Sequence, residues 1–110
     1  MSKREEPLGS LEHIVLLAVM RLGDDAYGIT VRREIEATIG RDLSVGAVYA
    51  TLVRLESKGF VKSSAGEPTA ERGGRAKRYF RVTVEGKAAL RDTHAIITKM
   101  SEGIKGLGAT

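Results

Sequence analysis

The chain has 110 residues, of which 42% are hydrophobic and 29% charged, which suits one soluble globular domain. It contains no cysteine, and this excludes a disulfide scaffold, thiolate metal sites and a cysteine nucleophile. The formal net charge is +4, and residues 44–81 alone hold eight Lys or Arg against three Asp or Glu. A basic excess of this kind favours polyanionic partners such as nucleic acid or anionic lipid.

No segment predicts export or membrane insertion. The first six residues carry charges of both signs, unlike a signal peptide. The longest apolar run, residues 14–20, is far shorter than the about 20 residues that a membrane span needs. We therefore expect a cytoplasmic protein without a membrane partner.

Capping residues, glycines and apolar periodicity divide the first half of the chain into helices. Residues 1–9 are expected to form a flexible arm. Ser10 and Ser44 are favourable N-caps, and Asp24-Asp25 could cap the helix between them. Apolar residues at intervals of three and four then predict three amphipathic helices. These helices are expected over residues 11–22, 26–39 and 45–57.

The second half predicts a hairpin and one long helix. Residues 60–63 and 78–83 have the composition and alternation of short strands, joined by a loop rich in Gly, Glu and Arg. Thr83 is a favourable N-cap for a final helix over residues 84–104.

This order of elements predicts a mainly α fold with a small β-hairpin, a winged helix-turn-helix plus one C-terminal helix. Residues 1–83 would form a DNA-binding domain, and residues 84–110 a C-terminal dimerisation helix and tail. The third helix would be the recognition helix, and the loop over residues 64–77 would be the wing.

Several motifs at these positions resemble the PadR family. Residues 44–59 fit its pattern Ser-x-Gly-x-x-Tyr-x-x-Leu-x-x-Leu-x-x-x-Gly. The resemblance extends from about residue 8 to residue 90 and includes Leu11 to Leu17, Tyr27-Gly28, and Gly73-Gly74-Arg75 followed by Arg78-Tyr79-Phe80.

The resemblance implies a bacterial, dimeric transcriptional regulator, in most cases a repressor that leaves its operator on sensing a signal. The short chain is similar to the subgroup with a single C-terminal dimerisation helix. Two departures stand out: Ala50 occupies a position where the family commonly has Pro, and the chain has no Trp. Some multidrug-binding members use Trp to stack flat ligands, so that mechanism is not expected here.

A helical wheel of the third helix places small residues opposite its apolar stripe. Such residues let a helix approach the floor of a major groove, and an Ala methyl can contact a thymine methyl. Because the chain has no Asn or Gln, the bidentate amide contact to adenine is excluded. An ordinary solvated helix is the alternative. The residues expected to face bases are Ser44, Gly46, Ala47, Ala50, Thr51 and Arg54.

Two tyrosines and the wing are expected to contact phosphates. The resemblance implies this role for Tyr49, whose alternative is a half-buried packing residue. Tyr27 either contacts phosphate near the start of the second helix or simply packs. The basic wing suits sequence-tolerant contacts to phosphate or the minor groove, or is merely a solvated surface. Its cations are Arg72, Arg75, Lys77 and Arg78.

The last helix has a heptad pattern of apolar residues that requires a partner. It either packs back on its own domain or pairs with a second copy of the chain. The expected dimer seam comprises Leu90, Thr93, Ile97, Met100, Ile104 and Leu107. By analogy with the family, an effector would bind at the dimer interface. The residues expected to line that site are Val15, Val19, Ile97 and Met100.

Catalytic and metal sites are not expected. His13 and His94 are the only histidines, and neither has a second ligand at metal-like spacing. No nucleophile elbow, phosphate-binding loop or dinucleotide fingerprint occurs in the sequence, so we expect no enzyme and no cofactor.

The expected partners are double-stranded DNA, a second copy of the chain and a small-molecule effector. Two recognition helices about 34 Å apart would read an inverted-repeat operator, and an effector would release it. Two alternatives remain at this point: a winged-helix protein-interaction module, and a ligand-sequestering dimer with incidental DNA binding.

Overall fold

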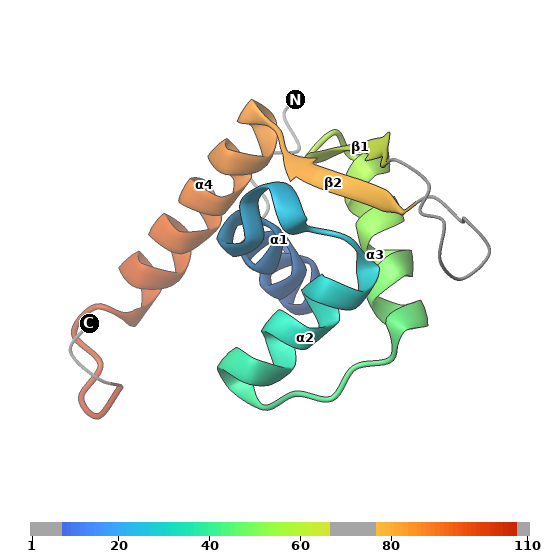
Figure 1. The fold of residues 1–110 in the computed structure, drawn as a ribbon. Coiled ribbons are helices and arrows are strands. Elements are labelled where there is room, and N and C mark those ends of the chain that lie inside the picture. Colours follow the sequence, from blue (N-terminus) through green and yellow to red (C-terminus); the bar gives the residue numbers. More distant parts are fainter. Residues whose placement is uncertain (1–7, 67–76, 108–110) are drawn as a thin grey trace.

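The computed structural model describes residues 8–66 and 77–107, and it has the predicted order of elements (Figure 1). The fold is a winged helix: three helices, an antiparallel hairpin and a fourth helix. The elements are α1 (Ser10–Leu22), the 3-10 turn η2 (Gly23–Asp25), α2 (Gly28–Ile39), α3 (Val45–Ser57), β1 (Val61–Ala65), β2 (Arg78–Val82) and α4 (Val84–Ser101).

The helix caps predicted at Ser44 and Thr83 are confirmed. The Ser44 hydroxyl accepts a hydrogen bond from the Ala47 amide at 3.0 Å, and the Thr83 hydroxyl accepts one from the Gly86 amide at 3.0 Å. The prediction for Ser10 is wrong, because Ser10 is already helical and Gly9 is the N-cap.

The second helix begins later than predicted, and its expected caps, Asp24 and Asp25, lie instead in the 3-10 turn η2. Ala26 is buried, and its carbonyl accepts a hydrogen bond from the Phe80 amide of β2 at 2.8 Å. The Tyr27 amide donates to the Thr30 hydroxyl at 2.9 Å, so α2 begins at Gly28. This short extended piece therefore ties the base of the hairpin to the helices.

The hairpin follows the predicted alternation. Val61 pairs with Val82 and Ser63 pairs with Phe80 in an antiparallel register. Phe80 and Val82 point into the core, whereas Arg81 between them is exposed. The apolar face of the hairpin thus closes one side of the helical layer.

The core lies where α1, α2 and α3 meet. Its largest fully buried side chains include Leu16 of α1, Val31 of α2, and Leu52 and Leu55 of α3. Among the described residues, every buried side-chain nitrogen or oxygen has a hydrogen-bond partner. This rigid core fixes the direction in which α3 presents its outer side.

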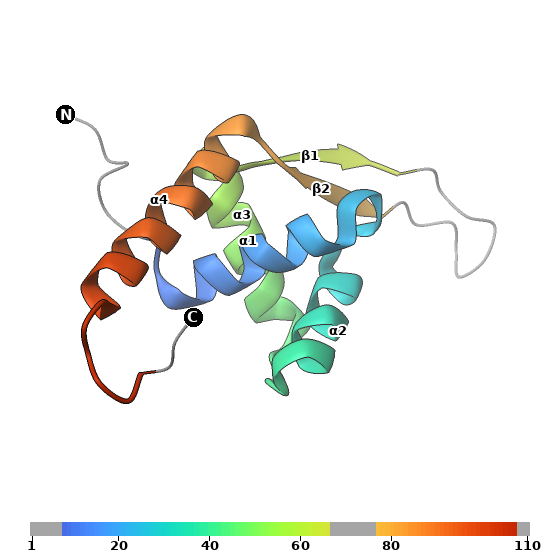
Figure 2. The ribbon, with the colours of Figure 1, turned by 90° about the vertical axis from the view of Figure 1, so that its left-hand side faces the viewer.

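The fourth helix changes its surroundings along its length. Its first half packs on the core through Gly86, Ala89 and Leu90, whereas its second half is largely exposed. In Figure 1, α3 and the hairpin lie at one side of the molecule and α4 at the other, with α1 between them. Figure 2 gives the same arrangement from the side.

The last helix is shorter than predicted. It ends at Ser101, and Gly103 adopts a positive φ of 77°, a left-handed conformation that glycine accepts without strain. Among the residues that the structure covers, no helix is long and apolar enough to cross a membrane.

Candidate nucleic-acid interface

The side of α3 that points away from the core is made of small and apolar residues. Gly46, Ala50 and Ser57 are exposed, and Val53 is 42% exposed. We call these four residues the outer face of α3. All four are uncharged, and three of them have small side chains, so the helix backbone lies close to the surface here.

The expectation that Thr51 contacts bases is wrong. Thr51 is completely buried, and its hydroxyl donates to the Ala47 carbonyl at 2.8 Å. The same oxygen accepts a hydrogen bond from Arg54 Nη2 at 3.1 Å. Thr51 therefore belongs to the flank of α3 that packs towards α1, and Ala47 on the same flank is only partly exposed.

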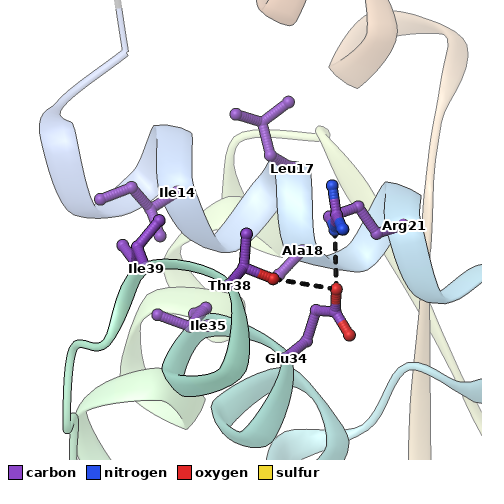
Figure 3. Close-up of a pocket in the computed structure, with 8 residues that line it drawn as sticks. All are labelled: Ile14, Leu17, Ala18, Arg21, Glu34, Ile35, Thr38 and Ile39. Atoms are coloured by element: carbon purple, nitrogen blue, oxygen red, sulfur yellow. Dashed lines mark hydrogen bonds and ion pairs between the residues drawn. The ribbon is translucent and has the colours of Figure 1, made fainter.

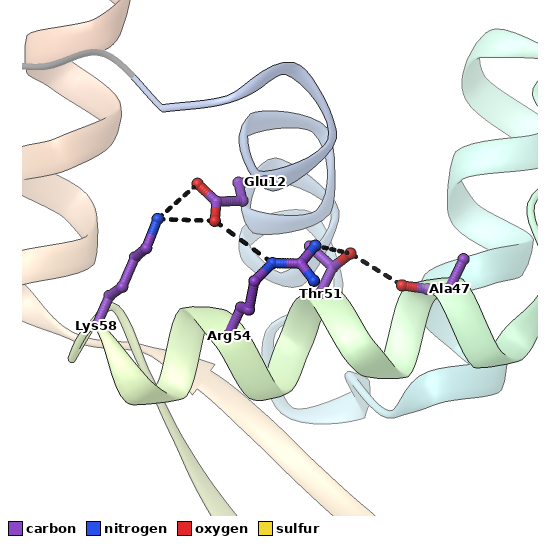
Figure 4. Close-up of polar contacts among 5 residues, drawn as sticks. All are labelled: Glu12, Ala47, Thr51, Arg54 and Lys58. Atoms are coloured by element: carbon purple, nitrogen blue, oxygen red, sulfur yellow. Dashed lines mark hydrogen bonds and ion pairs between the residues drawn. The ribbon is translucent and has the colours of Figure 1, made fainter.

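Arg54 also lies on this flank and is held there. Its Nε atom is 3.8 Å from Glu12 Oε2 in the first turn of α1 (Figure 4). Lys58 Nζ reaches the same carboxylate at 2.8 and 3.1 Å. Neither Glu12 nor Lys58 is among the residues predicted from the sequence to lie at this interface. The spacing of Arg54 and Lys58 by four residues was the available signal, because such residues share one side of a helix.

The turn before α3 is fixed by α2. Arg32 donates from Nε to the Leu43 carbonyl at 2.7 Å and from Nη2 to Asp42 at 3.0 Å. These contacts set the position of Ser44, whose oxygen caps α3 while its hydroxyl hydrogen remains free to donate. Ser44 is exposed, as the sequence predicts.

At the base of the wing, a cation lies over one of two aromatic rings that pack together. Lys77 Nζ lies 4.9 Å from the centroid of the Tyr27 ring, and Tyr27 packs edge-on against Tyr79 at 5.2 Å. Lys77 itself is exposed. Arg72 and Arg75, two of the four predicted wing cations, lie outside the described residues.

Arg78 forms an ion pair with Glu56 of α3. Its Nη2 atom is 3.4 Å from Glu56 Oε1, and the Ser63 hydroxyl donates to Glu56 Oε2 at 2.7 Å. The hydrogen bond from Ser63, assisted by the charge of Arg78, lowers the pKa of Glu56 below its ordinary value. Glu56 is thus ionised at neutral pH and offsets part of the charge of the wing.

Tyr49 packs on the hairpin and is also accessible to solvent. Its ring packs edge-on against Phe80 with centroids 6.2 Å apart, and the residue remains 39% exposed. It lies at the edge between α3 and the hairpin, so its contact with phosphate stays a prediction.

The predicted dimer seam is only partly available. Leu90 is 9% exposed and Thr93 2%, and Thr93 accepts a hydrogen bond from the Leu8 amide at 3.0 Å. These two residues belong to the core of their own chain, so their assignment to the seam is wrong. Ile97 and Met100 are exposed on α4. Two other members, Ile104 and Leu107, are exposed but follow the end of the helix.

The expected effector site needs a similar correction. Val15 is completely buried in the core, and Val19 is 2% exposed and borders a shallow pocket beside Met20 rather than the distal part of α4. A groove of about 210 Å³ lies instead between α1 and α2 (Figure 3). Arg21 and Glu34 form an ion pair at one end of it, at 2.7 Å. Its apolar lining consists of Ile14, Leu17, Ala18, Ile35 and Ile39.

The histidines form no metal site in the part of the chain that the structure covers. No group of three or more potential ligand side chains occurs within residues 8–66 and 77–107. His13 of α1 is partly buried, and this burial lowers its pKa, with a smaller contribution from the charge of His94 on α4.

Comparisons with known proteins agree on one family. The sequence model of the transcriptional regulator PadR-like family matches residues 16–92. No curated protein matches the sequence. A PadR family regulator from Eggerthella lenta is 28% identical, with 82% of this chain and 76% of that chain covered and a TM-score of 0.64.

Two further solved structures share the fold. A transcriptional regulator from Clostridium thermocellum is 24% identical, with 92% of each chain covered and a TM-score of 0.72. A PadR family regulator from Clostridium difficile is 24% identical, with 84% of this chain and 95% of that chain covered and a TM-score of 0.66. On the strength of the family match, this chain belongs to the PadR-like family of transcriptional regulators.

Proposed function

We propose that this regulator is a homodimeric, cytoplasmic repressor that binds double-stranded DNA through α3 and the wing. The observation that carries the proposal is the outer face of α3. A solvated helix normally carries Lys and Glu on its exposed side, whereas this one carries Gly46, Ala50, Val53 and Ser57.

Insertion of α3 into DNA is sterically and electrostatically reasonable. A major groove about 12 Å wide admits an α-helix, and small side chains permit close approach to the base edges. The two acidic residues at the flanks of α3 are each paired with a cation, Glu12 with Lys58 and Glu56 with Arg78. Ala47 and Ala50 would contact thymine methyl groups, and Ser44 would donate to an acceptor at the N-terminal end of the helix.

The wing and two tyrosines supply the phosphate contacts of this proposal. Lys77 and Arg78 are exposed on the hairpin beside α3, and Arg72 and Arg75 extend the same basic stretch in the sequence. Tyr27 and Tyr49 would donate from their hydroxyls. Contacts of this type position a protein on DNA without reading its sequence.

A second copy of the chain would cover the exposed apolar residues in the second half of α4. Ile97 and Met100 are 53% and 73% exposed, which is unusual for large apolar residues one helical turn apart. Pairing of two α4 helices would bury them and place two α3 helices on the two halves of an inverted repeat, about 34 Å apart.

Repression would be relieved by population shift. The dimer would exist in two states that differ in the spacing of the two α3 helices, and only one spacing would fit the operator. An effector that binds more tightly to the other state lowers the population that can bind DNA, and the ratio of its affinities for the two states sets the limit of this shift. The groove between α1 and α2 suits only a small apolar effector, because its volume of about 210 Å³ lies below the about 300 Å³ at which sites for drug-sized molecules begin.

The test is a fluorescence anisotropy titration of the full chain with the DNA upstream of its own coding sequence and a scrambled duplex of the same length. The proposal predicts preference for the upstream DNA and a log–log salt slope of about −0.9 per phosphate contacted. Equal, weak binding to both duplexes would contradict it. A protein-interaction module or a ligand-sequestering dimer would then be the better account.

A further inference from the structure

The carboxylate of Glu12 holds both cations on the α1-facing flank of α3. Lys58 Nζ contacts both carboxylate oxygens at 2.8 and 3.1 Å, and Arg54 Nε lies 3.8 Å from one of them. The side chain of Glu12 is only 12% exposed, whereas those of Arg54 and Lys58 are 54% and 50% exposed. An anchored anion thus binds two cations that solvent, and a polyanion, can reach.

Arg54 is held at a second point as well. Its Nη2 atom donates to the Thr51 hydroxyl at 3.1 Å, and that buried hydroxyl donates to the Ala47 carbonyl at 2.8 Å (Figure 4). The guanidinium therefore lies along α3 rather than projecting beyond it. Any phosphate that contacts Arg54 must compete with this arrangement.

The competition between Glu12 and the DNA phosphates affects non-specific and specific DNA binding to different extents. Binding to non-specific DNA consists almost entirely of contacts between cations and phosphates, so each cation withheld lowers it. A specific complex gains base contacts in addition to its phosphate contacts, so a smaller share of its affinity depends on two cations at one flank. Glu12 would therefore weaken non-specific binding more than specific binding.

We propose that Glu12 is a specificity-determining residue, which acts by withholding Arg54 and Lys58 from the phosphates of non-specific DNA. This inference rests on the proposed DNA-binding function. Glu12 is a positioning residue, because it acts through the two cations and needs no contact with DNA itself.

The test compares Glu12→Gln with the unmodified chain on a scrambled duplex at several salt concentrations. We expect Glu12→Gln to bind the scrambled duplex about two- to fivefold more tightly, the range that partly exposed ion pairs contribute. The salt slope should become steeper by about 0.9 for each cation that gains a phosphate contact. On a duplex selected from a random pool for tight binding, the gain should be smaller.

The matched control is Glu36→Gln, which removes the same charge. Glu36 is exposed on α2 and is in no ion pair within the described residues. Equal effects of Glu12→Gln and Glu36→Gln would overturn the inference, because only overall charge would then matter. A second comparison uses Arg54→Gln/Lys58→Gln, in which adding Glu12→Gln should change the affinity no more than Glu36→Gln does and should leave the slope unchanged.

The test remains decisive if Glu12→Gln is poorly folded. The variant Lys58→Gln, with Glu12 intact, should leave the salt slope on scrambled DNA unchanged, because this cation is already withheld. A slope shallower by about 0.9 would contradict the inference. Absence of any sequence preference in the unmodified chain would instead contradict the proposed function, so the two failures are distinguishable.

Discussion

The two halves of α4 share one sequence pattern but have different surroundings. From its start to its midpoint at Thr93, α4 is covered by its own chain: Leu90 and Thr93 are buried, and Gly86 lies against the backbone of Phe60. In the second half, Ile97 and Met100 continue the same heptad and are exposed. A heptad pattern therefore predicts an apolar stripe along a helix, but it does not predict whether the same chain or a second copy packs against that stripe. The stripe in the first half packs against the core of its own chain, and we propose that a second copy of the chain packs against the second half.

The largest effect is expected at the contact between α4 and the hairpin. A Cβ atom at Gly86 would lie 2.1 Å from the Phe60 carbonyl oxygen and 2.8 Å from Val82 Cγ1. Because the first obstacle is backbone, Gly86→Ala should lower the free energy of unfolding by about 3 kcal/mol or more. Urea denaturation measures this loss. A change below about 1 kcal/mol would show that the first half of α4 is not fixed on the core.

Truncating one apolar residue in each half sharpens the comparison. Leu90→Ala should lower the free energy of unfolding by about 2–3 kcal/mol at every protein concentration, because its contacts lie within one chain. Ile97→Ser should act mainly on association and raise the dimer dissociation constant by about tenfold or more. Urea denaturation and sedimentation equilibrium measure the two effects. An unchanged dissociation constant for Ile97→Ser would place the dimer interface elsewhere.

A pH titration probes the boundary between the halves, where His13 of α1 approaches His94 of α4. Burial, and to a lesser extent the charge of His94, lowers the pKa of His13 in the folded chain. The unfolded chain therefore binds more protons as the pH falls through about 6.5, and folding stability decreases there. His13→Gln should reduce this decrease, and His94→Gln should reduce it less. Thermal melts between pH 5 and 8 measure it, and an increase in stability on acidification would contradict the account.

The smallest effect is expected at the wing, far from α4. The Ser63 hydroxyl is the main cause of the lowered pKa of Glu56. Because this pKa is lowered on folding, the associated stabilisation is present at neutral pH and is lost as the pH falls through the acidic range. Ser63→Ala should raise the pKa of Glu56 towards the ordinary value of 4.5, as measured by an NMR titration of its side chain. An unchanged pKa would mean that Arg78 alone sets it.

Local signals in the sequence predicted much of the fold. The caps Ser44 and Thr83 act through their own helix turns, and the alternation around Phe80 depends only on the pleat of a strand. These features require no knowledge of the rest of the chain. The motif over residues 44–59 added the family, which the match of the family model confirms.

The remaining errors involve contacts between elements distant in the sequence. A helical wheel treats the two flanks of α3 as equivalent, whereas α1 covers one of them and buries Thr51. The pairing of Glu12 with Lys58 spans 46 positions and leaves no local signal. For the same reason Val15 and Val19 were expected to be accessible, although the core formed by α2 and α3 covers them.

The measurement that tests the central claim most directly is hydroxyl-radical footprinting of the full chain on DNA selected from a random pool. If two copies of α3 enter successive major grooves, two protected patches should appear on one face of the duplex, about 34 Å apart. The variant Ala50→Glu, which places a carboxylate on the outer face of α3, should remove both patches. A footprint that Ala50→Glu leaves intact, or no footprint at concentrations that saturate binding, would contradict the assignment of this face to DNA.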